Sequence, residues 1–427
     1  MDLTLPRGIR DIEPEDFALQ AKVTREFENV AGLFNFRMME PATLEHLATL
    51  RAKSGSDVDK EIYAFKDKGG RDVGLRFDLT VGMARYVCSR RDLRPPIKLA
   101  SVAGAWRYDE PQHARYRWFR QWDLEIFGPV SVGADAEVIE TTYRLYQKLG
   151  VKFSVQVGDR GAVQKFVNDG LGITDQEKAV DLMRALDKAK KKTLGELKRE
   201  YGTKGYKEKA IESLFEFGRI SGSQDHVLDA LSERGLESPA LVELRDELRG
   251  RGLTDVKYNM GVVRGIDYYT GIVFEVMDSE HPDLGSLAGG GRYDLLPRTF
   301  GRPDLSATGA AGGIERTAMA ISGKANPQPL LVYVAAAGPS SLQAARRTLT
   351  DLRESGISAE TSLQEKPLSK QLEDASRMGA TWAVIVGEKE AKEKAVTLRE
   401  MSTRVERSLP LSLAIDSILA GSQVGRR

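Results

Sequence analysis

Cysteine and histidine are scarce in this sequence, and their scarcity excludes several kinds of site. The single cysteine, Cys88, cannot form a disulfide within the chain or a cysteine-based zinc site, and it fits a reducing compartment. The four histidines are scattered without metal-ligand spacing, and no HExxH, CxxC or Walker-type GxxxxGK[ST] motif occurs. We therefore expect a cytoplasmic protein without fixed metal ligands, in which any nucleotide binds without a P-loop.

Long apolar runs are absent as well. The runs at 330–338 and 381–387 are far shorter than the roughly 20 residues that a membrane-spanning helix requires. The N-terminus is charged and lacks the apolar segment of a secretory signal, so we expect no membrane partner. A hydrophobic content of 41% and 427 residues indicate a globular protein of two or three domains. The net charge of +1 neither favours nor excludes nucleic acid, because local patches decide that.

Arginine, by contrast, is concentrated in the segment 106–128. The guanidinium fork suits phosphate recognition, and arginine is seldom buried unless its charge is matched. The pattern predicts a strand that enters, a turn around Pro111 and a strand that returns. An exposed basic hairpin at a sheet edge would explain the same residues. The segment holds four arginines: Arg107, Arg115, Arg117 and Arg120.

The returning strand carries three polar side chains at alternating positions. Gln121, Asp123 and Glu125 fall on one face, because successive side chains of a strand point to opposite sides. A polar row on an otherwise aromatic strand predicts a floor on which a polar ligand lies.

The spacing of apolar residues changes along the chain, and this predicts its domains. Closely spaced strands, with a helix at about 15–31, predict an α+β domain with an antiparallel sheet. A helical pattern follows, including 177–202, and strands then resume. After the Pro-containing linker 324–329, alternating strands and helices predict a small parallel α/β domain. We predict four segments: 1–170 and 253–325 for the α+β domain, 171–252 for a helical insertion, and 330–427 for the α/β domain.

The helical segment contains a basic run. Ten lysines and arginines stand against four acidic residues between Arg184 and Lys209. A solvated helix face is the simpler interpretation, and contact with a phosphate backbone is the functional one.

Two further arginines lie beside glycines. Arg264 precedes Gly265 and is followed by Tyr268 and Tyr269, so it can enter a pocket with aromatic walls. Arg316 follows the glycine-rich run at 309–313, where the backbone can approach a ligand closely. Each pattern is weak alone, because ordinary turns and helix starts also contain such residues.

Together the motifs are far more specific. GLRFDLT, the arginine hairpin, RGIDYYTG, GGGRYD and GIER occur in an order that resembles histidyl-tRNA synthetase, a class II aminoacyl-tRNA synthetase, over nearly the whole chain. RGIDYYTG is the most diagnostic, and the DLT and RYD triplets resemble the archaeal and eukaryotic branch. The resemblance implies a class II catalytic domain, a homodimer joined through motif 1 around Pro41, and a C-terminal anticodon-binding domain. The hairpin and the GGIER helix correspond to motifs 2 and 3.

The implied activity has two steps. The carboxylate of L-histidine attacks the α-phosphorus of ATP, which carries Mg²⁺, and pyrophosphate leaves. The histidyl group then passes to the 3′-terminal adenosine of tRNA(His). Arginines can stabilise the charge that develops on the phosphoryl oxygens.

The resemblance also assigns roles to individual residues. Arg107 and Arg264 are the expected catalytic residues: the first grips the α-phosphate, and the second bridges it to the substrate carboxylate. The expected histidine-binding residues are Asp78, Leu79, Thr80, Arg107, Gln121, Glu125, Arg264, Tyr268, Tyr269 and Tyr293. The expected ATP-binding residues are Arg107, Arg115, Gln121 and Arg316.

The sequence departs from the family in the motif 2 hairpin. Glu110 stands where a basic residue is usual, and His113 and Ala114 stand where the bacterial form has Lys-Gly. Two non-catalytic alternatives are a synthetase-like regulatory subunit of ATP phosphoribosyltransferase and an amino-acid sensor. Retention of Arg107, Arg264 and Arg316 favours the enzyme.

Overall fold

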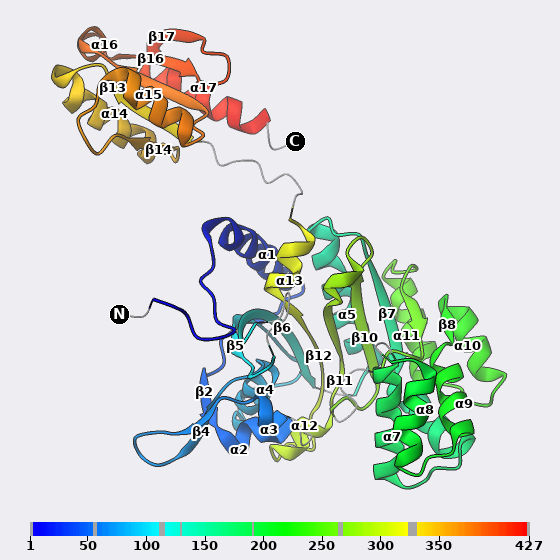
Figure 1. The fold of residues 1–427 in the computed structure, drawn as a ribbon. Coiled ribbons are helices and arrows are strands. Elements are labelled where there is room, and N and C mark those ends of the chain that lie inside the picture. The colour runs from blue at the N-terminus through cyan, green and yellow to red at the C-terminus, as the bar shows by residue number, and fades with distance from the viewer. Residues whose placement is uncertain are drawn as a thin grey trace. The chain divides into compact units, whose positions relative to one another are not determined.

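The computed structural model describes residues 3–53, 58–110, 116–128, 130–189, 192–263, 268–322 and 331–424. The chain forms two compact units, Met1–Ser322 and Gly323–Arg427, each with its own apolar core (Figure 1). Among the described residues, no helix is both long and apolar enough to cross a membrane.

A nine-stranded sheet forms the centre of the first unit. Neighbouring strands of this sheet pair antiparallel all the way from β5 to β7, which confirms the predicted antiparallel sheet. The sheet is mixed at its edges, however, because β1 pairs parallel with β5 and β9 pairs parallel with β7. These short edge strands carry too few residues to show a period in sequence. The spatial order is β1 (Arg37–Met38), β5 (Ile97–Trp106), β6 (Trp118–Gly128), β12 (Ser306–Gly313), β11 (Ser286–Arg292), β10 (Ile272–Asp278), β7 (Phe153–Asp159), β9 (Lys257–Asn259) and β8 (Ser221–Gly222).

Three helices cover one face of this sheet: α1 (Pro14–Leu33), α5 (Val132–Lys148) and α13 (Ile314–Ala320) (Figure 1). Trp122 of β6 is fully buried there, and its ring stacks on Phe27 at 5.0 Å between centroids. Leu124 and Ile126 belong to the same core. The even-numbered residues of β6 therefore face the helices, which leaves the odd-numbered polar residues on the opposite face, as predicted.

A second apolar cluster lies around α4 (Thr80–Ser89) and α12 (Leu295–Thr299). Next to it lies a small sheet with the strand order β2 (Leu44–His46), β4 (Asp72–Leu75) and β3 (Ala64–Lys66). Pro41 lies between β1 and β2 in the sequence and separates the two strands. The short helices here are α2 (Leu47–Leu50), η1 (Arg51–Lys53) and α3 (Val58–Glu61).

Helices gather beyond the β7–β9 end of the large sheet (Figure 1). The pattern at 177–202, predicted as one helix, forms two. Thr193 begins the second with a capping box, in which its side chain and that of Glu196 bond each other's backbone N–H. The helices are α6 (Arg160–Lys165), the π-turn η2 (Phe166–Gly170), α7 (Gln176–Lys188), α8 (Leu194–Thr203), α9 (Glu208–Gly218), α10 (Gln224–Ser232) and α11 (Pro239–Gly250); η3 (Pro282–Leu284) follows β10.

The basic run of these helices is extensively ion-paired. Lys188 and Lys192 both contact Glu200, at 2.5 and 2.6 Å, and Lys204 contacts Asp181 at 2.7 Å. This pairing favours the solvated helix face over a surface dedicated to phosphates.

The second unit contains a five-stranded sheet. The predicted parallel strands β13 (Leu331–Ala336), β14 (Ser358–Thr361) and β15 (Trp382–Val386) are present, and the sheet order is β14-β13-β15-β16-β17. The prediction of a purely parallel sheet was incomplete, because β16 (Ala395–Glu400) and β17 (Glu406–Pro410) add antiparallel strands. Their many charged residues concealed the strand pattern. The helices are η4 (Pro339–Ser341), α14 (Leu342–Glu354), α15 (Leu368–Arg377), α16 (Glu388–Glu393) and α17 (Leu411–Val424).

Candidate active site

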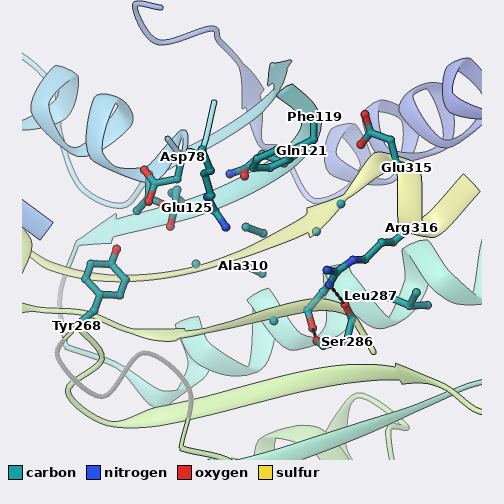
Figure 2. Close-up of a pocket in the computed structure, with 18 of the residues that line it drawn as sticks. Asp78, Phe119, Gln121, Glu125, Tyr268, Ser286, Leu287, Ala310, Glu315 and Arg316 are labelled. Atoms are coloured by element: carbon teal, nitrogen blue, oxygen red, sulfur yellow. Dashed lines mark hydrogen bonds between the residues drawn. The ribbon is translucent and has the colours of Figure 1, made fainter. Parts of the chain in front are cut away.

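A cavity of about 300 Å³ lies on the face of the large sheet that the three helices leave uncovered. Strands β6, β11 and β12 form its floor, and the segment before α4 and the tyrosines before β10 form one side (Figure 2). Figure 2 shows Asp78 and Glu125 together at one end and Arg316 directed toward Ser286 at the other. The cavity therefore has an acidic end and a basic end.

Buried hydrogen bonds organise the acidic end. Gln121 donates from Nε2 to Asp123 Oδ1 at 2.6 Å, and Thr80 donates from Oγ1 to Asp123 Oδ2 at 3.3 Å. Asp78 accepts from the backbone N–H of Val81 at 3.2 Å. Asp123 was not among the expected site residues. Its position on the polar face of β6, between Gln121 and Glu125, is the sequence feature that could have identified it. It orients the two groups that line the cavity.

Glu125 receives a hydrogen bond from a buried tyrosine. Tyr293 donates its hydroxyl to Glu125 Oε2, and Tyr268 stacks on Tyr293 with centroids 4.9 Å apart. Burial raises the pKa of both Tyr268 and Tyr293 well above the usual tyrosine range, so both stay neutral. A Cβ at Gly309, opposite on β12, would overlap the Glu125 carboxylate, which explains the glycine. The result is a carboxylate beside aromatic walls, an arrangement suited to an imidazole.

Backbone carbonyls orient the two described arginines that line the cavity. Arg107 donates from Nε to Phe77 O at 2.9 Å, and its guanidinium lies 5.0 Å from the ring centroid of Phe119. Arg316 donates from Nη1 to Ser286 O at 3.2 Å. A hydrogen bond to a neutral carbonyl orients a guanidinium without cancelling its positive charge, which suits a group that meets an anionic ligand.

Glu315, which sequence reasoning missed, fastens the helix of Arg316 to the floor. The β6–β12 ladder ends at the Gln121–Gly313 pair. One residue further, both carboxylate oxygens of Glu315 accept from the Arg120 backbone N–H, at 2.9 and 3.1 Å. Burial raises the pKa of this carboxyl. The Glu315 carboxylate thus takes the place of the backbone carbonyl that a longer β12 would offer to Arg120. No local sequence pattern reveals this bond, because it joins distant segments of the chain.

The N-terminal segment, residues 3–11, lies against the base of the motif 2 hairpin. The Arg10 guanidinium is 4.0 Å from the ring centroid of Tyr116, which lines the cavity. The backbone N–H of Arg117 donates to Gly8 O at 3.0 Å. Arg7 pairs with Glu110 at 2.8 Å, so the unusual acidic residue of the hairpin has a basic counterpart.

Most of the predicted site residues meet in this cavity. Leu79 differs, because its side chain is fully buried in the apolar cluster beside Met83 and does not line the cavity. Arg115 and Arg264, like His113 and Ala114, lie outside the described residues. Within the described ranges, no group of three or more His, Cys, Asp or Glu side chains could hold a metal ion. The predicted residues that line the cavity are Asp78, Thr80, Arg107, Gln121, Glu125, Tyr268, Tyr269, Tyr293 and Arg316.

Family models match both units of the chain. Residues 8–317 match the model described as Histidyl-tRNA synthetase, and residues 331–420 match the model described as Anticodon binding domain. The histidine–tRNA ligase of Thermococcus kodakarensis is 35% identical over 428 residues, covering 97% of each chain. That of Pyrobaculum islandicum is 33% identical over 410 residues, covering 95% of this chain and 96% of the other.

Solved structures share the fold. The histidyl-tRNA synthetase of Nostoc sp. PCC 7120 has a TM-score of 0.84 at 24% identity, covering 98% of this chain and 99% of the other. A Bacillus halodurans protein, titled an ATP phosphoribosyltransferase regulatory subunit/histidyl-tRNA synthetase, has a TM-score of 0.74 at 23% identity, covering 91% and 99%. At these identities the likeness concerns the fold alone.

Proposed function

Because the chain belongs to the histidyl-tRNA synthetase family, we propose that it ligates L-histidine to tRNA(His) with ATP as the energy source. The observation that carries this proposal is a cavity that has Asp78 and Glu125 at one end and Arg316 at the other, with Arg107 also in its lining. An amino acid offers an ammonium group and a carboxylate, and ATP offers phosphates. The two ligands match the cavity when the ammonium group lies at the acidic end and the phosphates lie at the basic end. The carboxylate of the amino acid then faces the α-phosphate of ATP.

Histidine occupies the acidic end in this proposal. Asp78, Thr80 and Gln121 hold the α-ammonium group, and the hydrogen bonds to Asp123 keep two of them in place. Glu125 accepts a hydrogen bond from the imidazole, with Tyr269 and Tyr293 beside it. Tyr268 supports Tyr293 by stacking.

ATP occupies the basic end, with Mg²⁺ accompanying its phosphates. Arg107 contacts the α-phosphate, and Arg316 reaches the outer phosphates together with Arg115. Arg264 bridges the histidine carboxylate and the α-phosphate, a role that rests on the RGIDYYTG motif. A carboxylate oxygen attacks the α-phosphorus, and the bond to the pyrophosphate oxygen breaks. The terminal ribose hydroxyl of tRNA then attacks the carbonyl carbon, and AMP leaves. The arginines stabilise the charge that develops in the first step.

We also propose a homodimer joined around Pro41. Four apolar side chains in the surrounding segment, residues 33–65, are substantially exposed, which favours a covering partner surface. They are Leu33, Met38, Leu44 and Phe65. A cytoplasmic location, expected from the single cysteine, stays a prediction.

Histidine-dependent exchange between ATP and pyrophosphate, followed by charging of tRNA(His), tests the proposed activity. Exchange with histidine and no other amino acid is expected. A regulatory subunit or an amino-acid sensor would bind histidine without catalysing exchange, and this outcome would reject the ligase.

A further inference from the structure

A buried polar cluster lies behind the acidic end of the cavity, on the opposite side of the sheet. We name it the Asp135 network, and its members are Asp135, Thr270, Arg292 and Asp294. Arg292 donates to Asp135 Oδ2 from Nη2 at 2.7 Å and from Nε at 3.1 Å. Both side chains are almost completely buried.

This ion pair joins two layers of the molecule. Asp135 belongs to α5, whereas Arg292 ends β11 and also donates to Ser306 Oγ of β12 at 3.0 Å. The next residue along the chain, Tyr293, points to the other side and reaches Glu125. The helix layer thus restrains the backbone from which the pocket tyrosine projects.

Thr270 connects a second pocket segment to the same network. Its backbone N–H donates to Arg292 O at 2.7 Å, and its hydroxyl accepts from the Asp294 N–H at 3.2 Å. Asp294 in turn accepts from the Ala307 N–H at 3.0 Å. Thr270 directly follows Tyr268 and Tyr269, so the network ties the segment of these tyrosines to that of Tyr293.

The ion pair is poorly suited to stabilising the fold. Burial raises the pKa of Asp135 to about 6 even though the Arg292 guanidinium lowers it, so the ionised carboxylate costs folding free energy at neutral pH. A well-packed apolar pair would often serve stability better. A buried charged pair that lowers the stability of the fold has a use if it fixes the positions of the segments that it joins.

We propose that the Asp135 network is a positioning element of the histidine pocket, which sets the spacing between Glu125, Tyr268 and Tyr293. This inference rests on the proposed function, because it assigns the imidazole to that pocket. Its members lie outside the cavity lining, so they act through the tyrosines and not by touching the substrate. A loosened network widens the pocket at its imidazole end and leaves the arginine end unchanged.

Two substitutions test the network. Asp135→Asn removes one charge without changing the shape, and Thr270→Val removes the hydroxyl that links the two segments. In pyrophosphate exchange, each is expected to raise the KM for histidine about tenfold, the effect of one lost polar interaction, while the KM for ATP changes less than about twofold. Glu140→Gln is the matched control. Glu140 lies on the same helix as Asp135 but does not line the cavity, and its carboxylate is 3.0 Å from the Arg251 guanidinium. It should change neither constant.

Calorimetric titration with histidine, with thermal melting alongside it, separates the outcomes. Equal changes in both KM values, or an unchanged histidine KM in a folded Thr270→Val variant, would overturn the inference. If the Asp135→Asn variant does not fold, the histidine KM of the Thr270→Val variant tests the inference by itself. A wild-type protein that binds histidine without exchange would reject the proposed ligase, and the histidine Kd of the variants would then test the network alone.

Discussion

Glu125 is expected to be the residue on which histidine binding depends most. A hydrogen bond to a charged carboxylate contributes about 1.5–3 kcal/mol, so Glu125→Gln should weaken histidine binding about tenfold to hundredfold. ATP binding should change little, because the ATP phosphates contact the arginine end of the cavity. Calorimetric titration with each ligand measures both effects. Equal losses for the two ligands would mean that Glu125 supports the structure instead.

Gly309 offers a test of the space around that carboxylate. Gly309→Ala would place a Cβ where the Glu125 carboxylate now lies, and Glu125 would have to move. We expect at least about a tenfold rise in the KM for histidine. Gly313→Ala on the same strand is the control, because the nearest atom to its Cβ would be 3.8 Å away, on the flexible Arg316 side chain. Similar histidine KM values in the two variants would contradict the prediction.

At the scale of elements, the N-terminal segment is expected to order the motif 2 hairpin. Arg10→Ala removes the cation–π contact with Tyr116, worth about 0.5–1 kcal/mol when exposed. Because Tyr116 lines the cavity, we expect a twofold to fivefold loss of kcat/KM for ATP with an unchanged melting temperature. Arg346→Ala, in the second unit, is a control that should leave exchange unchanged. An Arg10→Ala variant with wild-type exchange would show that the segment only covers the hairpin.

The elements that sequence predicted best are those whose pattern is local. The alternation of side chains along β6 predicted its two faces, and the spacing of apolar residues predicted α1. The two-residue strand β8 could not be predicted, because it exists only through pairing with a distant partner. The same reason hid Glu315 and the ion pair of the Asp135 network: the bonds from Arg120 to Glu315 and from Arg292 to Asp135 join segments more than 100 residues apart. Leu79 was among the expected histidine-binding residues because it lies between Asp78 and Thr80 in the DLT motif. Its apolar side chain packs in the core instead of lining the cavity.

At the scale of the whole molecule, the two units should divide the reaction. Each has its own core, and the described candidate site residues lie in the first unit. Truncation after Ser322 should therefore preserve histidine-dependent pyrophosphate exchange within about threefold and reduce tRNA charging at least about a hundredfold. Circular dichroism must show that the truncated chain folds. A folded truncation without exchange would refute this division.

The dimer is the second prediction for the whole molecule. A charge introduced among the exposed apolar residues of the segment 33–65 should disfavour association, because it would have to be buried without a partner. Phe65→Lys is expected to raise the dimer dissociation constant at least about a hundredfold. Light scattering over a concentration series measures it. Leu363→Lys, at an apolar residue that is 94% exposed in the second unit, is the control. A wild-type monomer at micromolar concentration would contradict the dimer.

The two faces of β6 make this strand intolerant of changes in length. Trp122 fills the core against α1, and its neighbours Gln121 and Asp123 serve the cavity from the other side. Losing a single residue before Gln121 would reverse the alternation for the rest of the strand. The tryptophan would then turn into the cavity, and the carboxylates would enter the apolar core. A reading-frame-preserving deletion of one codon here would therefore damage folding and substrate binding together, whereas a substitution could damage either one alone.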